Sequence, residues 1–66
     1  MSASEVTRVL VNLGFEFLRQ RGSHRIYSKN KTLITVPMHT GDLRKGTLHQ
    51  IIKQTGLSVE EFLHNR

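Results

Sequence analysis

The 66-residue chain contains no cysteine and no tryptophan, and it has a single proline. Without cysteine it can form no disulfide, no thiolate metal site and no cysteine nucleophile. Because secreted domains of this size often depend on disulfides, the absence favours a cytoplasmic protein. No apolar run approaches the roughly 20 residues that span a bilayer, so the sequence predicts no membrane segment.

Aromatic residues are also few, since only three phenylalanines and one tyrosine are present. A chain this short is expected to form one domain, here residues 1–66, and to bury only about 60% of its unfolded surface. The core is therefore small, and a deep pocket for a large cofactor is not expected. The sequence predicts an open surface site and no cofactor.

Acidic residues are scarce and unevenly placed. The chain has 10 Lys and Arg against 5 Asp and Glu, a formal net charge of +5 and a sequence pI near 10.5. From Phe17 to Gly41 there is no Asp or Glu at all. Such a basic surface attracts nucleic acid, an acidic protein or an anionic membrane. The membrane is the weakest of the three, because the basic residues lie in strand-like sequence and not on an amphipathic helix.

Helical patterns occur at both ends of the chain. Ser2 and Glu5 have the spacing of a capping box, in which each side chain bonds the backbone N–H of the other residue. Apolar residues follow at helical intervals, and Gly14 is placed to end a helix that we expect over residues 3–13. Two further helices are expected: one that opens at Gly46 and Thr47 and ends at Gly56, and a short one capped by Ser58.

The segment between these helices has the alternation and the β-branched residues of strands. Arg21–Ser23 contains a glycine and predicts a turn, and Asn30–Lys31 predicts a second turn in which Asn adopts the left-handed conformation. In the first strand, regular alternation puts Phe17 and Arg19 on the same face. The expected strands are 15–20, 24–29 and 32–36.

The length of the second turn sets the strand register. A two-residue turn pairs Lys29 with Thr32 and places His24 opposite Pro37, on the face away from the core. His39 then lies diagonal to His24, at roughly 7–8 Å between backbones. A three-residue turn would reverse the face of one strand relative to the other, and the sequence leaves both registers open.

The order of elements is helix, three strands, helix and short helix. This order predicts an α+β fold, in which two helices back a three-stranded antiparallel sheet on one face. The opposite face of the sheet is then open to a ligand.

His24 lies beside the first turn, in the most basic part of the chain. An imidazole that titrates near neutral pH, set among cations, suits cleavage of RNA without a metal. The simpler interpretation is a surface histidine on a basic hairpin that only binds a polyanion, and residue chemistry alone slightly favours it. The side chains expected to bind RNA are Arg19, Arg21, Ser23, Arg25, Lys29, Lys31 and Lys45.

His39 is the candidate for a second proton-transfer group, and the competing interpretation is that it only supports the loop before the second long helix. A metal site is the other possible use of the four histidines. No two of them have the four-residue spacing of a helical metal pair, and no carboxylate joins them in a ligand pattern. We therefore expect no metal ligand among them.

The whole chain, from Glu5 to Phe62, resembles the HicA family of bacterial and archaeal toxins. These toxins are small ribonucleases of toxin–antitoxin pairs. The motifs that carry the resemblance lie in the family's order and are Gly14-Phe15, Gly22-Ser23-His24, Val36-Pro37-Met38-His39, Gly46-Thr47-Leu48 with Ile51, and Gly56-Leu57-Ser58.

The resemblance implies a fold like the double-stranded RNA-binding domain, endonucleolytic cleavage of messenger RNA, and a HicB-family antitoxin that covers the basic face. It also implies that His24, in the Gly-Ser-His motif, is the catalytic histidine. The alternative is a non-catalytic RNA-binding module of the same fold, and a third possibility is a module that docks an acidic protein. A pure binding module has no need of a titrating group at position 24.

Overall fold

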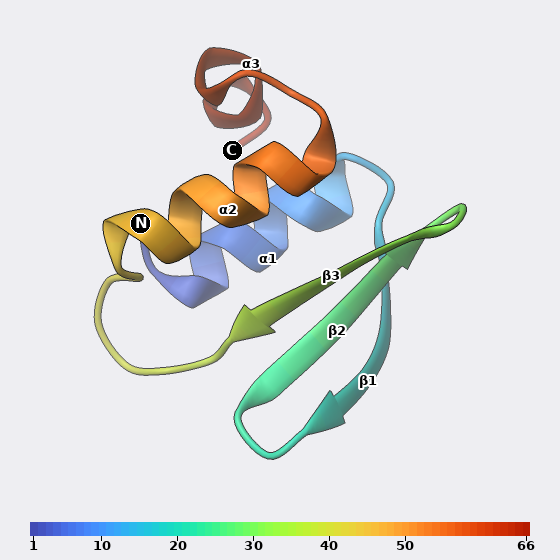
Figure 1. Ribbon diagram of the computed structural model, residues 1–66, viewed down its shortest axis with the longest axis vertical. Coiled ribbons are helices and arrows are strands. Elements are labelled where there is room, and N and C mark those ends of the chain that lie inside the picture. The colour runs from blue at the N-terminus through green and yellow to red at the C-terminus, as the bar shows by residue number, and fades with distance from the viewer.

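A computed structural model describes residues 1–66. The chain forms three helices and three strands, and their order and the α+β class agree with the sequence prediction (Figure 1). None of the helices is both long and apolar enough to cross a membrane. The elements are α1 (Ala3–Asn12), β1 (Glu16–Arg21), β2 (His24–Lys29), β3 (Thr32–Pro37), α2 (Lys45–Thr55) and α3 (Val59–His64).

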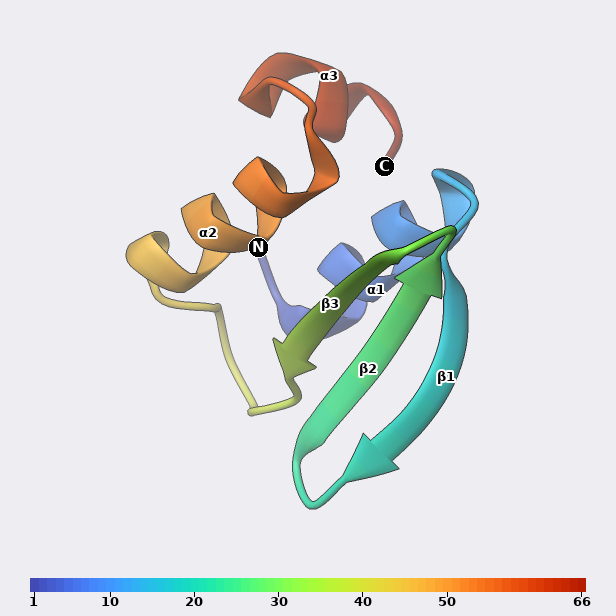
Figure 2. The ribbon, with the colours of Figure 1, turned by 45° about the vertical axis from the view of Figure 1, so that its right-hand side comes forward.

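The strands form one antiparallel sheet in the order β1-β2-β3, as in a double-stranded RNA-binding-domain-like fold. The helices lie on one side of this sheet, with α1 behind it and α2 beside β3, while the turn between β1 and β2 extends away from them (Figures 1 and 2). Every residue of β1 is exposed. The β1–β2 turn at Gly22 and Ser23 is exposed as well.

The ends of the helices follow the local sequence signals. The hydroxyl of Ser2 accepts from the backbone N–H of Glu5 at 3.1 Å, and the Glu5 carboxylate accepts from the N–H of Ser2 at 3.0 Å. Ser58 and Glu61 form the same pair of bonds at the start of α3. Both predicted capping boxes are confirmed, and each satisfies backbone donors that the first turn of a helix leaves free.

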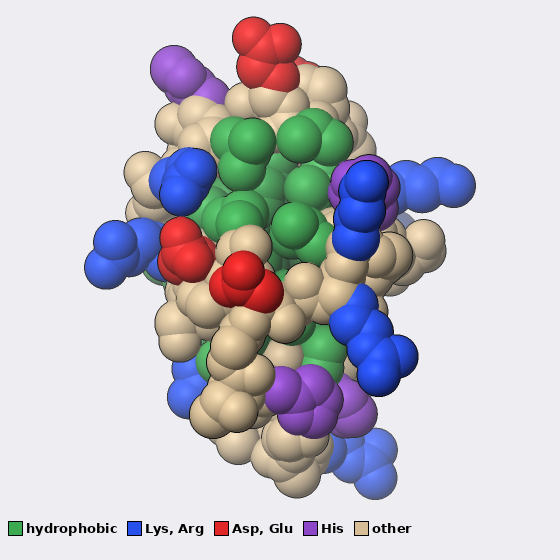
Figure 3. All heavy atoms as spheres, turned by 90° about the vertical axis from the view of Figure 1, so that its left-hand side faces the viewer, with side chains coloured by type: hydrophobic (Ala, Val, Ile, Leu, Met, Phe, Trp, Pro, Cys, Tyr) green, Lys and Arg blue, Asp and Glu red, His purple; other side chains and the backbone are tan.

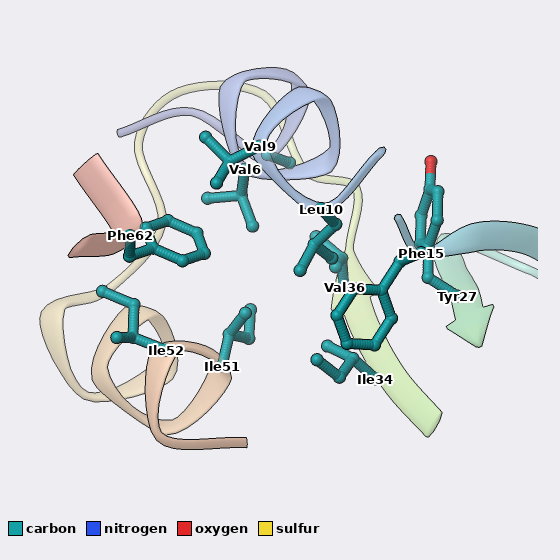
Figure 4. Close-up of a cluster of buried hydrophobic side chains, with 11 residues drawn as sticks. Val6, Val9, Leu10, Phe15, Tyr27, Ile34, Val36, Ile51, Ile52 and Phe62 are labelled. Atoms are coloured by element: carbon teal, nitrogen blue, oxygen red, sulfur yellow. The ribbon is translucent and has the colours of Figure 1, made fainter. Parts of the chain in front are cut away.

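The core lies between the three helices and the inner face of β2 and β3 (Figure 4). Tyr27 is only 4% exposed, as the inward side of β2 requires, and Phe62 is fully buried although α3 is short. Burial of a side chain such as Phe62 stabilises the fold by about 1.5–3 kcal/mol, so α3 is held by packing. The buried apolar residues are Ala3, Val6, Val9, Leu10, Phe15, Tyr27, Ile34, Val36, Ile51, Ile52 and Phe62.

The pairing of β2 with β3 follows the two-residue turn. Asn30 takes the left-handed conformation with φ of 54°, Lys29 pairs with Thr32, and His24 pairs with Pro37. Of the two registers that the sequence left open, the structure has the one set by the two-residue turn. It fixes which residues of β2 point away from the helices, and His24 is among them.

The pairing of β1 with β2 departs from the predicted alternation. Phe17 pairs with Tyr27 but Arg19 pairs with Ile26, so the register shifts at Leu18. The expectation that Phe17 and Arg19 share a face is wrong, because the bulge inserts one residue and reverses the faces beyond it. Phe17 stays on the core side, where its ring contacts that of Tyr27 edge-on at 5.8 Å. Arg19 turns to the open face.

Candidate functional site

Two exposed imidazoles lie next to each other at the end of the sheet that carries the β1–β2 turn. The ring centroids of His24 and His39 are 6.4 Å apart, and the ring planes meet at 76°. In Figure 3, purple imidazoles lie together near the bottom of the molecule with blue Lys and Arg side chains around them, and every red side chain in view lies above them. The structure therefore brings together the two histidines that the sequence placed on one diagonal.

The backbone explains how these rings meet. Pro37 ends β3, yet the N–H of Met38 donates to the carbonyl of Ser23 at 2.6 Å, so the chain stays beside the β1–β2 turn for one more residue. The next residue is His39, which begins the loop to α2. The far end of this loop is also tied down, because the N–H of Leu43 donates to the carbonyl of Met1 at 2.9 Å.

Two arginines of β1 share the face of His24. Arg21 pairs directly with His24 across the β1–β2 ladder, and Arg19 pairs with Ile26, the next outward residue of β2. Because residues that point to one face alternate along a strand, all four side chains belong to the open face. The bulge at Leu18 is what allows Phe17 to face the core while Arg19 and Arg21 face His24.

Arg25 and Lys29 lie on the opposite face of the sheet from His24. Arg25 is next to His24 in sequence and so points the other way, where its Nε donates to Oε1 of Gln20 at 3.2 Å. Strand alternation therefore divides the cations of the acid-free stretch between the two faces of the sheet.

Lys29 has a structural contact that the sequence did not reveal. Its Nζ donates to the carbonyl of Leu13 at 2.7 Å, at the C-terminal end of α1, and lies 5.8 Å from the centre of the Phe15 ring. A cation at this end of a helix is favourable because free carbonyl groups and the helix dipole are negative there. Lys29 is thus tied to α1 and is not beside His24.

The remaining predicted RNA contacts are spread along the molecule. Ser23 is exposed in the β1–β2 turn, next to His24. Lys31 lies in the turn between β2 and β3. The end of β2 before this turn is roughly 17 Å along the strand from His24. Lys45 is the first residue of α2 and is exposed, directly after the loop that carries His39. Of these three, Ser23 is nearest to the histidine pair along the backbone.

A cleft beside His39 was not predicted from the sequence. It has a volume of about 340 Å³ and lies between the end of β3, the following loop and the start of α2. No local pattern marks it, because its walls come from three segments that meet only in the folded chain. Its lining residues are Pro37, His39, Asp42, Leu43, Arg44 and Thr47.

Two carboxylates have clearly perturbed pKa values, and both belong to the capping boxes. Hydrogen bonds from the backbone and the hydroxyl of Ser2 hold the pKa of Glu5 below its ordinary value, and Ser58 does the same for the pKa of Glu61. These groups act at the starts of α1 and α3 and not beside the histidine pair. Nowhere do three His, Asp or Glu side chains gather in a group that could hold a metal ion.

An antiparallel sheet with helices on one side and exposed histidines and arginines on the other defines a small α+β domain with a basic, open site. The family described as HicA toxin of bacterial toxin-antitoxin matches residues 3–57. The chain therefore belongs to the HicA toxin family. Toxins of this family are generally ribonucleases that cleave messenger RNA, and each pairs with an antitoxin, HicB. A search of curated proteins found no match.

Proposed function

We propose that this protein is a toxin-type endoribonuclease that cleaves messenger RNA without a metal ion, with His24 as a general acid or base. The observation that carries the proposal is the exposed pair of His24 and His39, 6.4 Å apart, with Arg21 directly opposite His24. A messenger RNA substrate places the activity in the cytoplasm.

The chemistry uses the nucleophile that RNA itself supplies. One imidazole takes the proton of a 2′-hydroxyl, whose oxygen attacks the adjacent phosphorus. The bond from phosphorus to the 5′-oxygen breaks, and that oxygen receives a proton from the second proton-transfer group, for which the other imidazole of the pair is the candidate. The products are a 2′,3′-cyclic phosphate and a free 5′-hydroxyl. A ring separation of 6.4 Å lets one phosphate group lie within hydrogen-bond reach of both His24 and His39.

Arg19 and Arg21 supply the positive charge that this reaction needs. The phosphate gains negative charge as the 2′-oxygen attacks, and a guanidinium donates two parallel hydrogen bonds to phosphate oxygens. Arg21 stands next to His24 across the ladder, so it is the arginine assigned to the reacting phosphate. Arg19, one pair further along the same face, is assigned to a neighbouring phosphate of the chain.

The same surface supports the proposed mode of inhibition. A HicB antitoxin with an acidic surface or binding segment is expected to cover the His24 face, because opposite charges speed the encounter and orient the two proteins. RNA is then excluded by steric overlap. A complex that leaves His24 exposed and the RNA cleavage rate intact would overturn this mode of inhibition.

A non-catalytic RNA-binding module is the second candidate function, because the fold, the net charge of +5 and the open sheet face serve that role equally well. The two candidates differ in what they require of His24. A binding module loses little when His24 is replaced, whereas a ribonuclease loses a positioned acid or base, typically about 10²–10⁴-fold in rate.

The deciding experiment measures cleavage of end-labelled RNA in EDTA by the parent protein, His24→Ala and His49→Ala. His49 is a histidine of α2 outside the pair, so its variant controls for the loss of an imidazole. We expect the parent and His49→Ala to yield 2′,3′-cyclic phosphate ends and His24→Ala to be inactive. Thermal melts of the parent and His24→Ala should agree, because exposed substitutions change stability by about 0.5 kcal/mol or less. If His24→Ala folds and cuts at the parental rate, the proposed site is wrong.

A further inference from the structure

The cleft beside the histidine pair differs from the open face that carries Arg19 and Arg21, because its lining includes an acidic residue and apolar residues. Its wall includes His39, so it opens directly onto the proposed reaction site. Its volume of about 340 Å³ is in the range of small-ligand sites and is ample for one planar ring. A phosphate held between the two imidazoles would lie beside His39, and hence close to this cleft.

Asp42 is the unexpected residue in that wall. It is the only acidic residue between Glu16 and Glu60. Its side chain is 79% exposed, and its nearest cation is the N-terminal ammonium of Met1, 3.9 Å away. An ion pair at this distance with so exposed a carboxylate contributes little to stability. A carboxylate here also repels phosphate, so its position suits a ligand group that donates hydrogen bonds, and in RNA such donors are found on the bases.

We propose that this cleft binds the base next to the cleaved phosphate and that Asp42 selects guanine. The proposal rests on the ribonuclease function proposed above. Guanine presents two neighbouring donors, N1–H and N2–H, which match the two oxygens of one carboxylate. Adenine and cytosine each place a ring-nitrogen acceptor beside their amino group, and uracil flanks its single N–H with two carbonyls. Only guanine therefore pairs with Asp42 without bringing an acceptor against the carboxylate.

The other walls of the cleft suit a flat, partly apolar ligand. Pro37 and Leu43 offer apolar contact to the face of a base, and Arg44 offers a planar guanidinium of the kind that stacks on unpaired bases in RNA complexes. Thr47 lines both this cleft and a second groove along β3 and α2. A bound RNA chain could continue from the cleft into this groove. The side chains of that second groove are Leu33, Thr35, Thr47, Gln50, Ile51 and Gln54.

A binding experiment tests the base preference without any cleavage. The parent protein is titrated with GMP, AMP, CMP and UMP, and amide shifts of Leu43 and Thr47 are followed by NMR. We expect GMP to bind on the order of tenfold more tightly than the others, since a good bidentate pair discriminates by about 1–3 kcal/mol. Asp42→Asn should lose this preference, and Asp42→Glu should keep part of it. Glu60→Gln removes an equal charge from α3 and should leave the ratio unchanged.

A second experiment maps cleavage sites on an RNA that contains every dinucleotide. We expect the parent and Glu60→Gln to cut next to guanine on one side of the bond, and Asp42→Asn to cut without that preference. Equal binding of the four nucleotides, or guanine preference that persists in a folded Asp42→Asn, overturns the subsite. Selective GMP binding by a protein that cuts no RNA would instead overturn the ribonuclease function and leave the guanine site standing.

Discussion

His39 lies with its ring centre 6.4 Å from that of His24, although the two residues are 15 positions apart in the chain (39 − 24) and belong to different segments. The bond from the Met38 N–H to the Ser23 carbonyl holds these segments together at 2.6 Å. The proposed site is therefore built by backbone pairing at the end of a sheet. Its side chains remain exposed to solvent, as a substrate the size of messenger RNA requires.

The first prediction concerns the second proton transfer. If one imidazole acts as base and the other as acid, the rate must fall at low pH, where the base is protonated, and at high pH, where the acid is not. We expect a bell-shaped dependence of kcat/KM on pH for the parent protein. His39→Ala should lower the rate by about 10²–10⁴-fold and remove one limb of the bell.

The measurement for His39 is a set of initial cleavage rates across pH, with His49→Ala as the matched control. A small rate loss with both limbs retained would assign His39 to support of the loop, and His24 would then work with water or an arginine.

A second prediction concerns the two faces of the hairpin. Arg19 and Arg21 share the face of His24, whereas Arg25 points to the opposite face and bonds Gln20. Removing one phosphate-binding cation should reduce the salt slope of log affinity by about 0.7 for single-stranded RNA. We expect Arg21→Gln and Arg19→Gln each to flatten the slope by about this amount, and Arg25→Gln to flatten it less. The check is RNA affinity measured at several salt concentrations; an equal effect of Arg25→Gln would show that RNA binds both faces.

The third prediction separates stability from RNA binding at Lys29. Its ammonium bonds the Leu13 carbonyl at the end of α1, so Lys29→Gln should destabilise the fold by about 0.3–1 kcal/mol and lower the Tm by a few degrees. Lys31→Gln removes the same charge from the adjacent turn and is the control. Thermal melts of both variants give the comparison. If Lys31→Gln lowers the Tm as much as Lys29→Gln does, the loss of one positive charge explains the lower Tm and the bond to Leu13 does not.

A fourth prediction concerns acid stability. The capping bonds from Ser58 hold the pKa of Glu61 below its ordinary value of 4.5. A carboxyl whose pKa is lowered by folding stabilises the protein above its unfolded pKa, and this contribution is lost as pH falls through the folded pKa. Parent stability should therefore decline from about pH 5 downward. Glu61→Gln should flatten the decline, because Gln can keep the capping box but does not titrate.

The acid-stability measurement is the Tm across pH for the parent, Glu61→Gln and Glu60→Gln. Glu60 lies in the same first turn of α3 but takes no part in the capping box. A Glu60→Gln variant that flattens the acid decline as much as Glu61→Gln would contradict the assignment to the cap.

Much of the fold was predictable because its signals are local. The capping boxes at Ser2 and Ser58 and the glycines after α1 and α2 mark helix ends within a few residues. The left-handed Asn30 made the β2–β3 turn two residues long, and that length fixed the register and the outward position of His24. The proximity of His39 followed from the same register.

The bulge at Leu18 was not predictable from the first strand alone. Regular alternation puts Phe17 and Arg19 on one face, and only the contact of Phe17 with the buried Tyr27 shows why an extra residue is needed. Likewise, nothing near Lys29 in the sequence indicates a bond to Leu13, because α1 and β2 meet only in the folded protein.

The sequence by itself determined the elements and the basic character of the chain, because caps, turn residues and alternation act over a few neighbouring positions. It narrowed the register of β2 with β3 to two choices, and the structure has the register of the two-residue turn. The tertiary structure decided which cations stand beside His24 and which stand elsewhere, and it formed the cleft with Asp42. Those outcomes depend on how the core and the tied ends of the His39 loop arrange distant segments. The physical reason is that a bulge, a contact between distant segments and a cleft are set by packing across the whole molecule, which no local pattern records.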